Sequence, residues 1–467
     1  MKYVVNHFRF RKLNDGFLVT TNHGSWAYLN KDEFEQLESG EICSDKLLQR
    51  FEEKGLVVTK NNKETIKNDF NTRYNYLRQS TSLHIIVVTL RCNQKCIYCQ
   101  TSSTAENSKG YDMDEATAEK TVDFIFQSPS KYLTIEFQGG EPLLNFQIIK
   151  KITNYAKEVN KRYNKELRFV MVSNLLPITE GIMDYCINEG IDICTSLDGP
   201  KELHDKNRPY SSSGYEITTK WIKRIRDEYK QRKIERQMNA LVTITKESLA
   251  YPRQIIDEYV ALGLKGIHLR YFNKLGYATK NREKIEYTPE EFIEFWKKAV
   301  DYIIKLNKKG NFFRERGTTI ILQKILQKMD PGFLDMRSPC GAVIGQMSYN
   351  YNGEIFCCDE GRMIKEDIFK LGSVKEQSFK STISNETSTS LIASSINDTE
   401  ICDLCSYKPY CGICPVCNYA EQGSVIANIP QTTFCKVFKA QFDYVFSRYL
   451  FDKDAKEILD SWVNNLD

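Results

Sequence analysis

The stretch LHIIVVTLRCNQKCIYCQ, residues 83–100, decides the fold. Its first half is a run of apolar and β-branched residues, which predicts a buried strand at 83–90. Three cysteines follow directly, at Cys92, Cys96 and Cys99. Three thiolates are one short of a closed four-coordinate metal site. Either the fourth ligand lies elsewhere in the chain, or the site stays open for an external ligand.

The chain has the bulk composition of a folded cytoplasmic protein. Its 467 residues are 41% hydrophobic and 27% charged, and 65 Lys and Arg stand against 61 Asp and Glu. This near balance gives no argument for nucleic acid as a partner. No apolar run reaches the ~20 residues of a membrane span, and the first residues lack an apolar secretory core. We therefore expect a cytoplasmic localisation without a membrane partner.

The fifteen cysteines are bunched rather than spread along the chain. Three lie in 92–99, three in 340–358 and six in 402–435. Disulfide-dense proteins are mostly small secreted domains, so bunching in a large chain favours metal or cluster binding. Cys186 and Cys194 stand apart from these groups, inside predicted elements, and are expected to be buried core thiols.

Strands and helices alternate from residue 83 onward, which predicts an α/β fold. Helical patterns lie between most of the strand patterns, and this alternation implies a parallel sheet with both faces covered. Right-handed crossovers would wind it into a partial barrel. Ligands of such sheets collect at the carboxyl ends of the strands, where the cysteine triplet falls. The further strand patterns are 132–138, 167–174, 191–197, 238–245 and 266–272.

A second motif, GGEP at residues 139–142, follows the second strand pattern. Paired glycines let the backbone approach a ligand closely, and Glu141 can accept hydrogen bonds from an ammonium group. The three cysteines alone fit two sites equally well. One is a [4Fe–4S] cluster with an open iron, and the other is a zinc site completed by a distant residue. GGEP beside the triplet favours the cluster.

Together, the triplet, GGEP and the six strand patterns resemble the radical S-adenosylmethionine (radical SAM) superfamily, over roughly residues 83–275. The resemblance implies that Cys92, Cys96 and Cys99 hold a [4Fe–4S] cluster whose open iron binds SAM. Cleavage of SAM then yields a 5′-deoxyadenosyl radical that abstracts hydrogen from the substrate. By the same resemblance, the methionine end of SAM lies at Gly139, Gly140 and Glu141.

Other polar residues at strand ends are further cofactor-binding candidates under this resemblance. Tyr98 matches an aromatic position of the family motif, where the ring would shield the cluster or the adenine. Each of these residues could equally serve in packing, capping or a structural ion pair. The set is Tyr98, Ser173, Asn174, Ser196, Asp198 and Arg208.

The C-terminal cysteines resemble the SPASM extension of radical SAM enzymes, which carries two further [4Fe–4S] clusters, three in all. The resemblance assigns auxiliary cluster II to four thiols and auxiliary cluster I to three. The family pattern expects its next ligand four residues beyond Cys411, after three intervening residues, but Pro415 stands there. Zinc ribbons are the alternative for these C-x2-C pairs. The assigned ligands are Cys402, Cys405, Cys411 and Cys435 for cluster II, and Cys340, Cys358 and Cys414 for cluster I.

Two points in this region stay open. The fourth ligand of cluster I is Cys357 or Cys417, or the position is open to substrate. Asp359 follows Cys358, and in sulfatase-maturing members an aspartate here is proposed as the catalytic base. A carboxylate beside a cluster can serve as a base for other substrates too, or it can simply solvate a loop.

The organisation predicts a partial (β/α)6 radical SAM barrel flanked by two smaller domains. At the N-terminus, short strands precede helices, one of them capped by Asn30, as in small α+β domains that bind the leader of a precursor peptide. The alternative is a packing extension of the main domain. The expected division is 1–75 leader recognition, 76–285 radical SAM core, 286–337 helical linker, 338–450 SPASM domain and 451–467 C-terminal helix.

Several blocks, among them TLRCNQKCIYCQ, EFQGGEPLLNF and KPYCG, resemble the radical SAM maturase of His-Xaa-Ser repeat peptide systems. That resemblance implies a ribosomal precursor peptide as substrate, an electron donor such as flavodoxin or ferredoxin, and a second radical SAM protein as a further candidate partner. The reaction would be a side-chain crosslink through a thioether, ether or C–C bond. The alternatives are a sulfatase-type maturase that forms formylglycine and a non-enzymatic iron–sulfur electron carrier.

Overall fold

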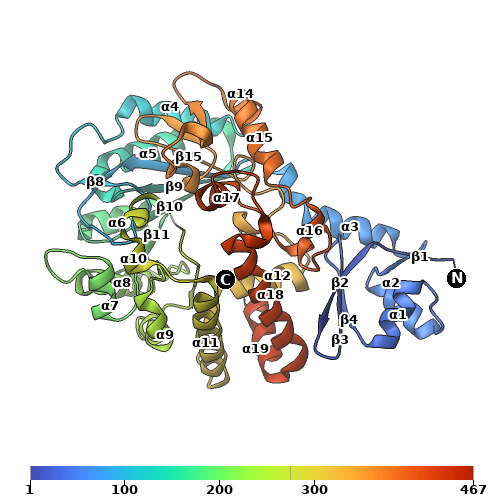
Figure 1. The fold of residues 1–467 in the computed structure, drawn as a ribbon. Helices are drawn as coiled ribbons and strands as arrows, with labels where there is room; N and C mark the ends of the chain where they lie inside the picture. The colour runs from blue at the N-terminus through green and yellow to red at the C-terminus, as the bar shows by residue number, and fades with distance from the viewer. Residues whose placement is uncertain (1, 274, 466–467) are drawn as a thin grey trace.

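The computed structural model describes residues 2–273 and 275–465, and one large mixed sheet organises most of them (Figure 1). Its eight strands lie in the order β12-β11-β10-β9-β6-β15-β16-β17. The strands from β12 to β6 run parallel, and β15 pairs parallel to β6. The parallel strands are β6 (Leu83–Thr89), β9 (Tyr132–Gly139), β10 (Glu166–Ser173), β11 (Ile191–Ser196) and β12 (Asn239–Leu241).

Helices connect these parallel strands and bury their apolar faces against the sheet. In β6 every residue after Leu83 is buried, as expected for a strand covered on both faces. The strands predicted at 83–90, 132–138, 167–174 and 191–197 are confirmed to within one residue at each end. The connecting helices are α4 (Glu115–Phe126), α5 (Phe146–Tyr163), α6 (Glu180–Glu189), α7 (Lys201–Asn207), α8 (Gly214–Gln231) and α9 (Pro252–Ala261).

The last two predicted strands are shorter than expected, and the prediction of a sixth strand in this sheet is wrong. The pattern at 238–245 forms only the three residues of β12. The pattern at 266–272 forms β13 (Gly266–Ile267), which pairs with β14 (Arg314–Glu315) in a separate two-stranded sheet. Residues 268–272 keep the alternating pattern but form no strand. The prediction failed here because side-chain periodicity does not show whether the backbone has a strand to pair with.

The other side of the sheet is extended by a hairpin from far along the chain. An Asn-Gly turn at 352–353 joins the antiparallel pair β15 (Gln346–Tyr349) and β16 (Glu354–Phe356). Gly353 has a φ of 91°, which favours glycine. β17 (Lys370–Ser373) pairs with β16. Because β15 pairs with β6, the cysteine-rich region is continuous with the core sheet.

The N-terminal unit, residues 2–58, has a sheet and a small core of its own. Strands β2 (Phe8–Leu13), β3 (Gly16–Thr21) and β4 (Trp26–Leu29) form an antiparallel sheet. Helices α1 (Lys31–Ser39) and α2 (Asp45–Glu53) pack on one face around residues such as Phe34 and Phe51. Asn30 caps α1 in a capping box with Glu33, as predicted. Short strands β1 (Val4–Val5) and β5 (Val57–Val58) pair beside them, and α3 (Lys63–Arg73) leads to the core.

Four helices near the C-terminus lie between the N-terminal unit and the core sheet (Figure 1). They are α11 (Pro289–Lys308), α12 (Arg316–Leu326), α18 (Thr433–Phe451) and α19 (Lys453–Asn464). Thr288 caps α11 in a capping box with Glu291. Trp296 on α11 packs edge-on against Tyr444 on α18, with ring centroids 5.2 Å apart. Among the described residues, no helix combines the length and the apolar character that crossing a membrane requires.

Four of the five histidines have lowered pKa values because they are buried. Burial lowers the pKa of His23 to about 4 and of His84 and His204 to about 3, and it holds the pKa of His268 well below its ordinary value. His84 is fully buried, and its Nδ1 lies 2.8 Å from the Tyr349 hydroxyl. These imidazoles are therefore neutral in the folded protein at pH 5, whereas they are protonated in the unfolded chain.

We expect acid to destabilise the fold below pH 6.5. The unfolded state takes up protons from about pH 6.5 downward, and the folded state does so only near pH 3–4, so stability is lost as the pH falls through this window. Each such histidine contributes a slope of about 1.4 kcal/mol per pH unit. Denaturant unfolding at pH 7.0 and 5.5 measures the loss. The variant His84→Gln should lose less stability than the parent; an equal loss would contradict the assignment.

Candidate active site

The three cysteines of the triplet lie on one loop at the carboxyl end of β6. Cys92 ends β7 (Arg91–Cys92), which pairs with β8 (Thr104–Ala105). All three thiols are half-buried. Burial raises the pKa of Cys92 to about 12 and of Cys96 to about 11, and the neighbouring thiols of the triplet raise these pKa values further. The three thiols therefore lie near enough to act on one another, at the edge of the sheet where the sequence predicts a ligand.

The GGEP turn packs directly against this loop. The Gly140 amide donates to the Thr89 carbonyl at 2.9 Å, and the Glu141 amide donates to the Arg91 carbonyl at 2.8 Å. A Cβ on Gly139 would lie 2.3 Å from the Thr89 oxygen, and one on Gly140 would lie 2.4 Å from the Arg91 oxygen. The paired glycines thus let the turn approach the backbone carbonyls of Thr89 and Arg91 closely. This close approach fixes the turn beside Cys92.

Glu141 joins the end of β9 to the end of β10. Its side chain is buried, and one carboxylate oxygen accepts hydrogen bonds from the Ser173 hydroxyl at 2.7 Å and the Leu143 amide at 3.0 Å. The other accepts from the Asn174 amide at 2.8 Å. Burial raises the pKa of Glu141 to about 6. Both oxygens are used within the protein, so Glu141 positions Ser173 and Asn174 instead of presenting a free carboxylate.

The end of β10 is in turn tied to the triplet loop. The Asn174 side-chain amide donates to the Asn93 side-chain oxygen at 2.8 Å, and Asn93 follows Cys92 directly. The Asn174 side-chain oxygen accepts from the Leu176 amide. The prediction that the triplet, GGEP and the residues after 167–173 meet at one edge is confirmed by these contacts.

A buried polar network lies behind the triplet loop. The Tyr98 hydroxyl donates to the Asp198 carboxylate at 2.8–2.9 Å, and the Arg208 guanidinium donates to the Tyr98 oxygen at 2.7 Å. Arg208 also donates to the Gln94 side-chain oxygen at 3.2 Å, and the Gln94 amide donates to the Arg208 carbonyl at 3.0 Å. All four side chains are buried. Gln94 was not singled out by its sequence, because its partner lies more than a hundred residues away.

This network gives three of the candidate cofactor contacts the structural role that was the alternative for them, and their contact with a cofactor stays a prediction. The polar groups of Tyr98, Asp198 and Arg208 bond to one another instead of pointing out of the loop. Charge pairing inside a buried network is stable only when its members satisfy each other, as they do here. These residues therefore hold the backbone that carries Cys96 and Cys99. Ser196, by contrast, stays half-exposed at the end of β11.

The inner face of the parallel sheet carries a second group of polar side chains. On β9, Glu136 and Gln138 are half-buried, whereas the alternating Ile135 and Phe137 are fully buried on the opposite face. Burial raises the pKa of Glu136, and the charge of Asp359 raises it further, while Gln138 and Arg316 oppose the shift. The Gln138 amide donates to Glu136 at 2.7 Å. Asp359, from the cysteine-rich region, therefore lies near enough to this face of the sheet for its charge to act on Glu136.

Cys194 also lies on this inner face, so the prediction that it is a buried core thiol is wrong. It is half-buried on β11, between the buried Ile193 and Thr195. Burial raises its pKa to about 12, with further contributions from Glu136 and Arg316. Cys186, inside α6, is fully buried as predicted. A parallel strand is apolar on both faces more often than not, and the single thiol gave no sign of the face it occupies.

The C-terminal cysteines form two groups. In the first, the thiols of Cys340 and Cys417 donate hydrogen bonds to Cys414, which holds the pKa of Cys414 well below its ordinary value. The charge of Cys414 also acts on Cys358. Cys357 lies behind Cys358, with 3.7 Å between the two sulfur atoms, and is fully buried. Of the two candidates for a fourth ligand, Cys417 is the one that contacts Cys414.

The second group is Cys402, Cys405, Cys411 and Cys435. These thiols line a cavity of about 360 Å³, which also reaches Cys414 of the first group. Burial raises the pKa of Cys411 well above its ordinary value, and Cys405, Cys435 and Cys402 raise it further. No three His, Cys, Asp or Glu side chains of the described ranges meet closely enough to hold a single metal ion. A set of thiols around a cavity fits a [4Fe–4S] cluster, in which each thiolate binds a different iron.

Comparison with known proteins identifies the family. Residues 86–259 match the Radical SAM superfamily. An uncharacterized protein of Methanocaldococcus jannaschii is 31% identical over 223 residues, which cover 47% of this chain and 72% of that protein. The chain belongs to the radical SAM superfamily. Membership implies SAM and a [4Fe–4S] cluster as cofactors of this radical SAM protein, and its thiol triplet has the donor chemistry that such a cluster needs.

Other relatives and structures cover more of this radical SAM protein. The cysteine-type anaerobic sulfatase-maturating enzyme of Clostridium perfringens is 24% identical over 379 residues, 79% of this chain and 97% of that enzyme. The solved structure titled native anSMEcpe with bound AdoMet superimposes with a TM-score of 0.68 at 22% identity, over 83% of this chain and all of that one. Streptococcus suis SuiB bound to its precursor peptide SuiA superimposes with a TM-score of 0.55 at 14% identity, over 91% and 98%. These likenesses show the shared fold.

Proposed function

We propose that this radical SAM enzyme modifies a ribosomally made precursor peptide and installs a side-chain crosslink through a thioether, ether or C–C bond. The observation that carries the radical chemistry is the meeting of the triplet, the GGEP turn and the end of β10 at one edge of the sheet. The peptide substrate is supported by relatives whose names describe maturation of sulfatases and by a structural neighbour bound to a precursor peptide.

In this proposal Cys92, Cys96 and Cys99 hold the SAM-binding cluster. When bound there, the cluster and SAM supply a 5′-deoxyadenosyl radical. The chain's own contribution is to fix the loop: Glu141 and Asn174 tie it to two strand ends, and the network around Tyr98 supports it from behind. The backbone of Gly139 and Gly140, with Ser173 and Ser196, lines the place we assign to the methionine and ribose of SAM.

The substrate side chain would lie on the inner face of the sheet, between Glu136 on β9 and Asp359. Asp359 pairs with Arg362 at 3.3 Å, and its side chain remains partly exposed. A carboxylate in this position can accept the proton that a substrate loses when its radical is oxidised and a new bond closes. We therefore retain Asp359 as the proposed base.

The two groups of C-terminal thiols would hold the auxiliary clusters. For cluster II we propose the four predicted ligands, which surround one cavity. For cluster I we propose Cys340, Cys358, Cys414 and Cys417, because Cys417 contacts Cys414 and Cys357 does not. Clusters held by these thiols would supply an acceptor for the electron left on the product radical. An electron donor such as flavodoxin or ferredoxin is the proposed partner that reduces the SAM-binding cluster.

Two neighbouring buried thiols test the ligand set of cluster I. We expect Cys417→Ser to lose about four of about twelve irons per chain after anaerobic reconstitution, since three [4Fe–4S] clusters hold that total. Cys357→Ser should keep them. Iron and acid-labile sulfide analysis measures both variants. The reverse pattern, with iron lost only from Cys357→Ser, would contradict the choice of Cys417.

The N-terminal unit and α3, within the predicted recognition domain 1–75, would bind the leader of the peptide. The solved structure with a bound precursor peptide aligns over more of this chain than the sulfatase-maturase structure does. A second radical SAM protein remains a proposed additional partner.

A sulfatase-type maturase is the second candidate, favoured by the relatives and by a carboxylate near the inner face of the sheet. Anaerobic co-expression with small peptides encoded beside the gene distinguishes the two. A crosslink removes two hydrogens and suppresses fragment ions inside one segment of the peptide, and the product does not react with an aldehyde reagent such as a hydroxylamine. A formylglycine reacts with it and fragments normally. Absence of 5′-deoxyadenosine from every reaction would refute both.

A further inference from the structure

The N-terminal unit packs against the part of the chain that carries most of the cluster II thiols. The Trp26 ring meets Phe446 on α18 edge-on, with centroids 5.3 Å apart, and its indole N–H donates to the Ile325 carbonyl at 2.8 Å. Leu18 on β3 belongs to the main hydrophobic core of the molecule. An interface that shares the core holds its two parts in one position, unlike the polar contacts that allow domain motion.

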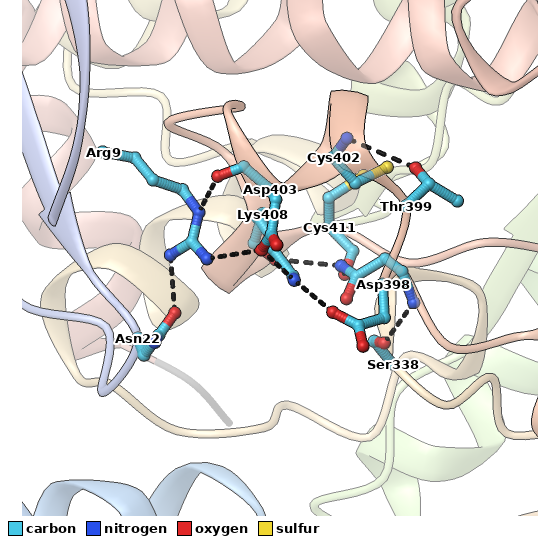
Figure 2. Close-up of polar contacts among 10 residues, drawn as sticks. Arg9, Asn22, Ser338, Asp398, Thr399, Cys402, Asp403, Lys408 and Cys411 are labelled. Carbon is cyan, nitrogen blue, oxygen red and sulfur yellow. Dashed lines mark hydrogen bonds and ion pairs between the residues drawn. The ribbon is translucent and has the colours of Figure 1, made fainter. Parts of the chain in front are cut away.

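The centre of this contact is the cluster II loop, residues 402–411, which carries Cys402, Cys405 and Cys411. Figure 2 shows Arg9 of β2 reaching into the loop. Its guanidinium donates to the Asp403 carbonyl at 2.5 Å and to the Asp403 carboxylate at 3.0 Å, and it also holds the Asn22 side chain. Arg9 is only 4% exposed. A buried guanidinium fixed by three acceptors constrains the backbone that follows Cys402.

Further contacts from the same sheet fall between the loop's cysteines. The Thr20 hydroxyl donates to the Ser406 carbonyl at 2.7 Å, next to Cys405. The Tyr410 hydroxyl donates to the Gly24 carbonyl at 3.1 Å, next to Cys411. Because the loop has only short helical turns of its own, α16 (Glu400–Asp403) and a 3-10 turn at Lys408–Tyr410, these contacts supply much of its support.

Positively charged side chains beside the cluster II loop are consistent with an anionic group bound by its thiols. Arg73, at the end of α3, lies over the Tyr410 ring at 5.1 Å, and Lys324 acts electrostatically on Cys411. Arg337 is close to them and pairs with Asp330. Arg73 and Arg337 are therefore buried cations beside the loop, and Asp330 pairs with Arg337, whereas burial lowers the pKa of Lys324 to about 7. A cluster bound by four thiolates carries net negative charge, which would offset the remaining positive charge.

We propose that the N-terminal unit supports, from outside the cavity, the loop that carries three of the cluster II thiols, with Arg9 as a positioning residue for that cluster. The inference rests on the cluster II ligand set proposed above. If the N-terminal unit moved away, the loop that carries Cys402, Cys405 and Cys411 would lose its support. The unit proposed to bind the leader peptide is therefore held in a fixed position beside cluster II.

Two arginines of the N-terminal unit provide a matched test. Arg9→Gln removes the contact with the loop, whereas Arg50→Gln removes a contact internal to the unit, since Arg50 pairs with Glu33 and donates to the Tyr28 carbonyl. In full-length reconstituted protein, we expect Arg9→Gln to lose up to about four of about twelve irons, or to alter the EPR signal and midpoint potential of one cluster. Release of 5′-deoxyadenosine from SAM should persist. Arg50→Gln should match the parent.

Two further variants make the outcome decisive. Thr20→Val deletes one hydroxyl at constant shape, so it should reproduce a weaker form of the Arg9 effect without unfolding the unit. Arg9→Lys should recover part of the iron. Parent-like iron content, EPR spectrum and potential in both Arg9→Gln and Thr20→Val would overturn the inference. Cys435→Ala separates this failure from that of the ligand set: if it keeps all its iron, the proposed cluster II ligands are wrong.

Discussion

Replacing Cys99 with Ala should abolish reductive cleavage of SAM. In a [4Fe–4S] cluster each thiolate binds one iron, so without Cys99 two of the four irons would have no protein ligand. Changes in groups that merely support a metal ligand typically cost ~10–100-fold, and loss of a ligand should exceed ~100-fold. The measurement is 5′-deoxyadenosine released from SAM and dithionite under anaerobic conditions. Iron should fall by about four per chain at the same time.

Cys43→Ala is the control for that experiment. Cys43 is an exposed thiol in the N-terminal unit, outside all three thiol groups, so its loss should change neither the iron content nor SAM cleavage. The residual clusters of Cys99→Ala should keep their own EPR signals, which shows that the protein is folded. Cleavage by Cys99→Ala at a tenth of the parent rate or more would refute the role of the triplet.

The core of the fold could be predicted because its local signals agree with its packing. The run of apolar residues in β6 can be buried only between two layers, and the helical patterns after it supply those layers. Caps at Asn30 and Thr288 were also predictable, since a capping box depends on residues three apart. The prediction of a sixth strand in the core sheet was wrong because it rested on local periodicity alone. β13 pairs with β14, about fifty residues away, and no local signal reports that partner.

The candidate site was predicted in its location and only partly in its contacts. That the triplet, GGEP and the end of β10 meet follows from parallel topology, which brings strand ends to one edge. The direction of each side chain does not follow. Asp198 and Arg208 were candidates for a cofactor contact or for a structural ion pair. In the structure Asp198 accepts from Tyr98, and Arg208 donates to Tyr98 and Gln94, because buried polar groups must satisfy one another.

The N-terminal unit gave an equally partial signal. Its strands and helices match the sequence pattern, yet the side chains that decide its role, Arg9 and Thr20, look like ordinary polar residues of an exposed strand. Their partners, Asp403 and Ser406, lie almost four hundred residues away. No local rule reports a contact at that separation, and for this reason the sequence leaves leader recognition and packing as alternatives for this unit.

Replacing Glu141 with Ala should nearly abolish SAM binding. The change leaves the Ser173 hydroxyl and the amides of Leu143 and Asn174 buried without an acceptor, and each such loss costs about 1–3 kcal/mol. The end of β10 would then move away from the triplet loop, because Asn174 also holds Asn93. We expect the affinity for SAM, measured by equilibrium binding to the reconstituted protein, to fall by at least ~100-fold.

Glu141→Gln should lie between Ala and the parent. Its amide oxygen can still accept from the Ser173 hydroxyl and the Leu143 amide, but its NH2 group would meet the Asn174 amide, and two donors cannot bond to each other. Glu166→Ala is the control, because Glu166 begins β10 as an exposed carboxylate whose ion pair with Lys131 is 3.8 Å long. Iron content should stay at the parent level in all three variants, since Glu141 supports the loop without being a ligand. Parent-like SAM affinity in Glu141→Ala would show that β10 keeps its place without this carboxylate.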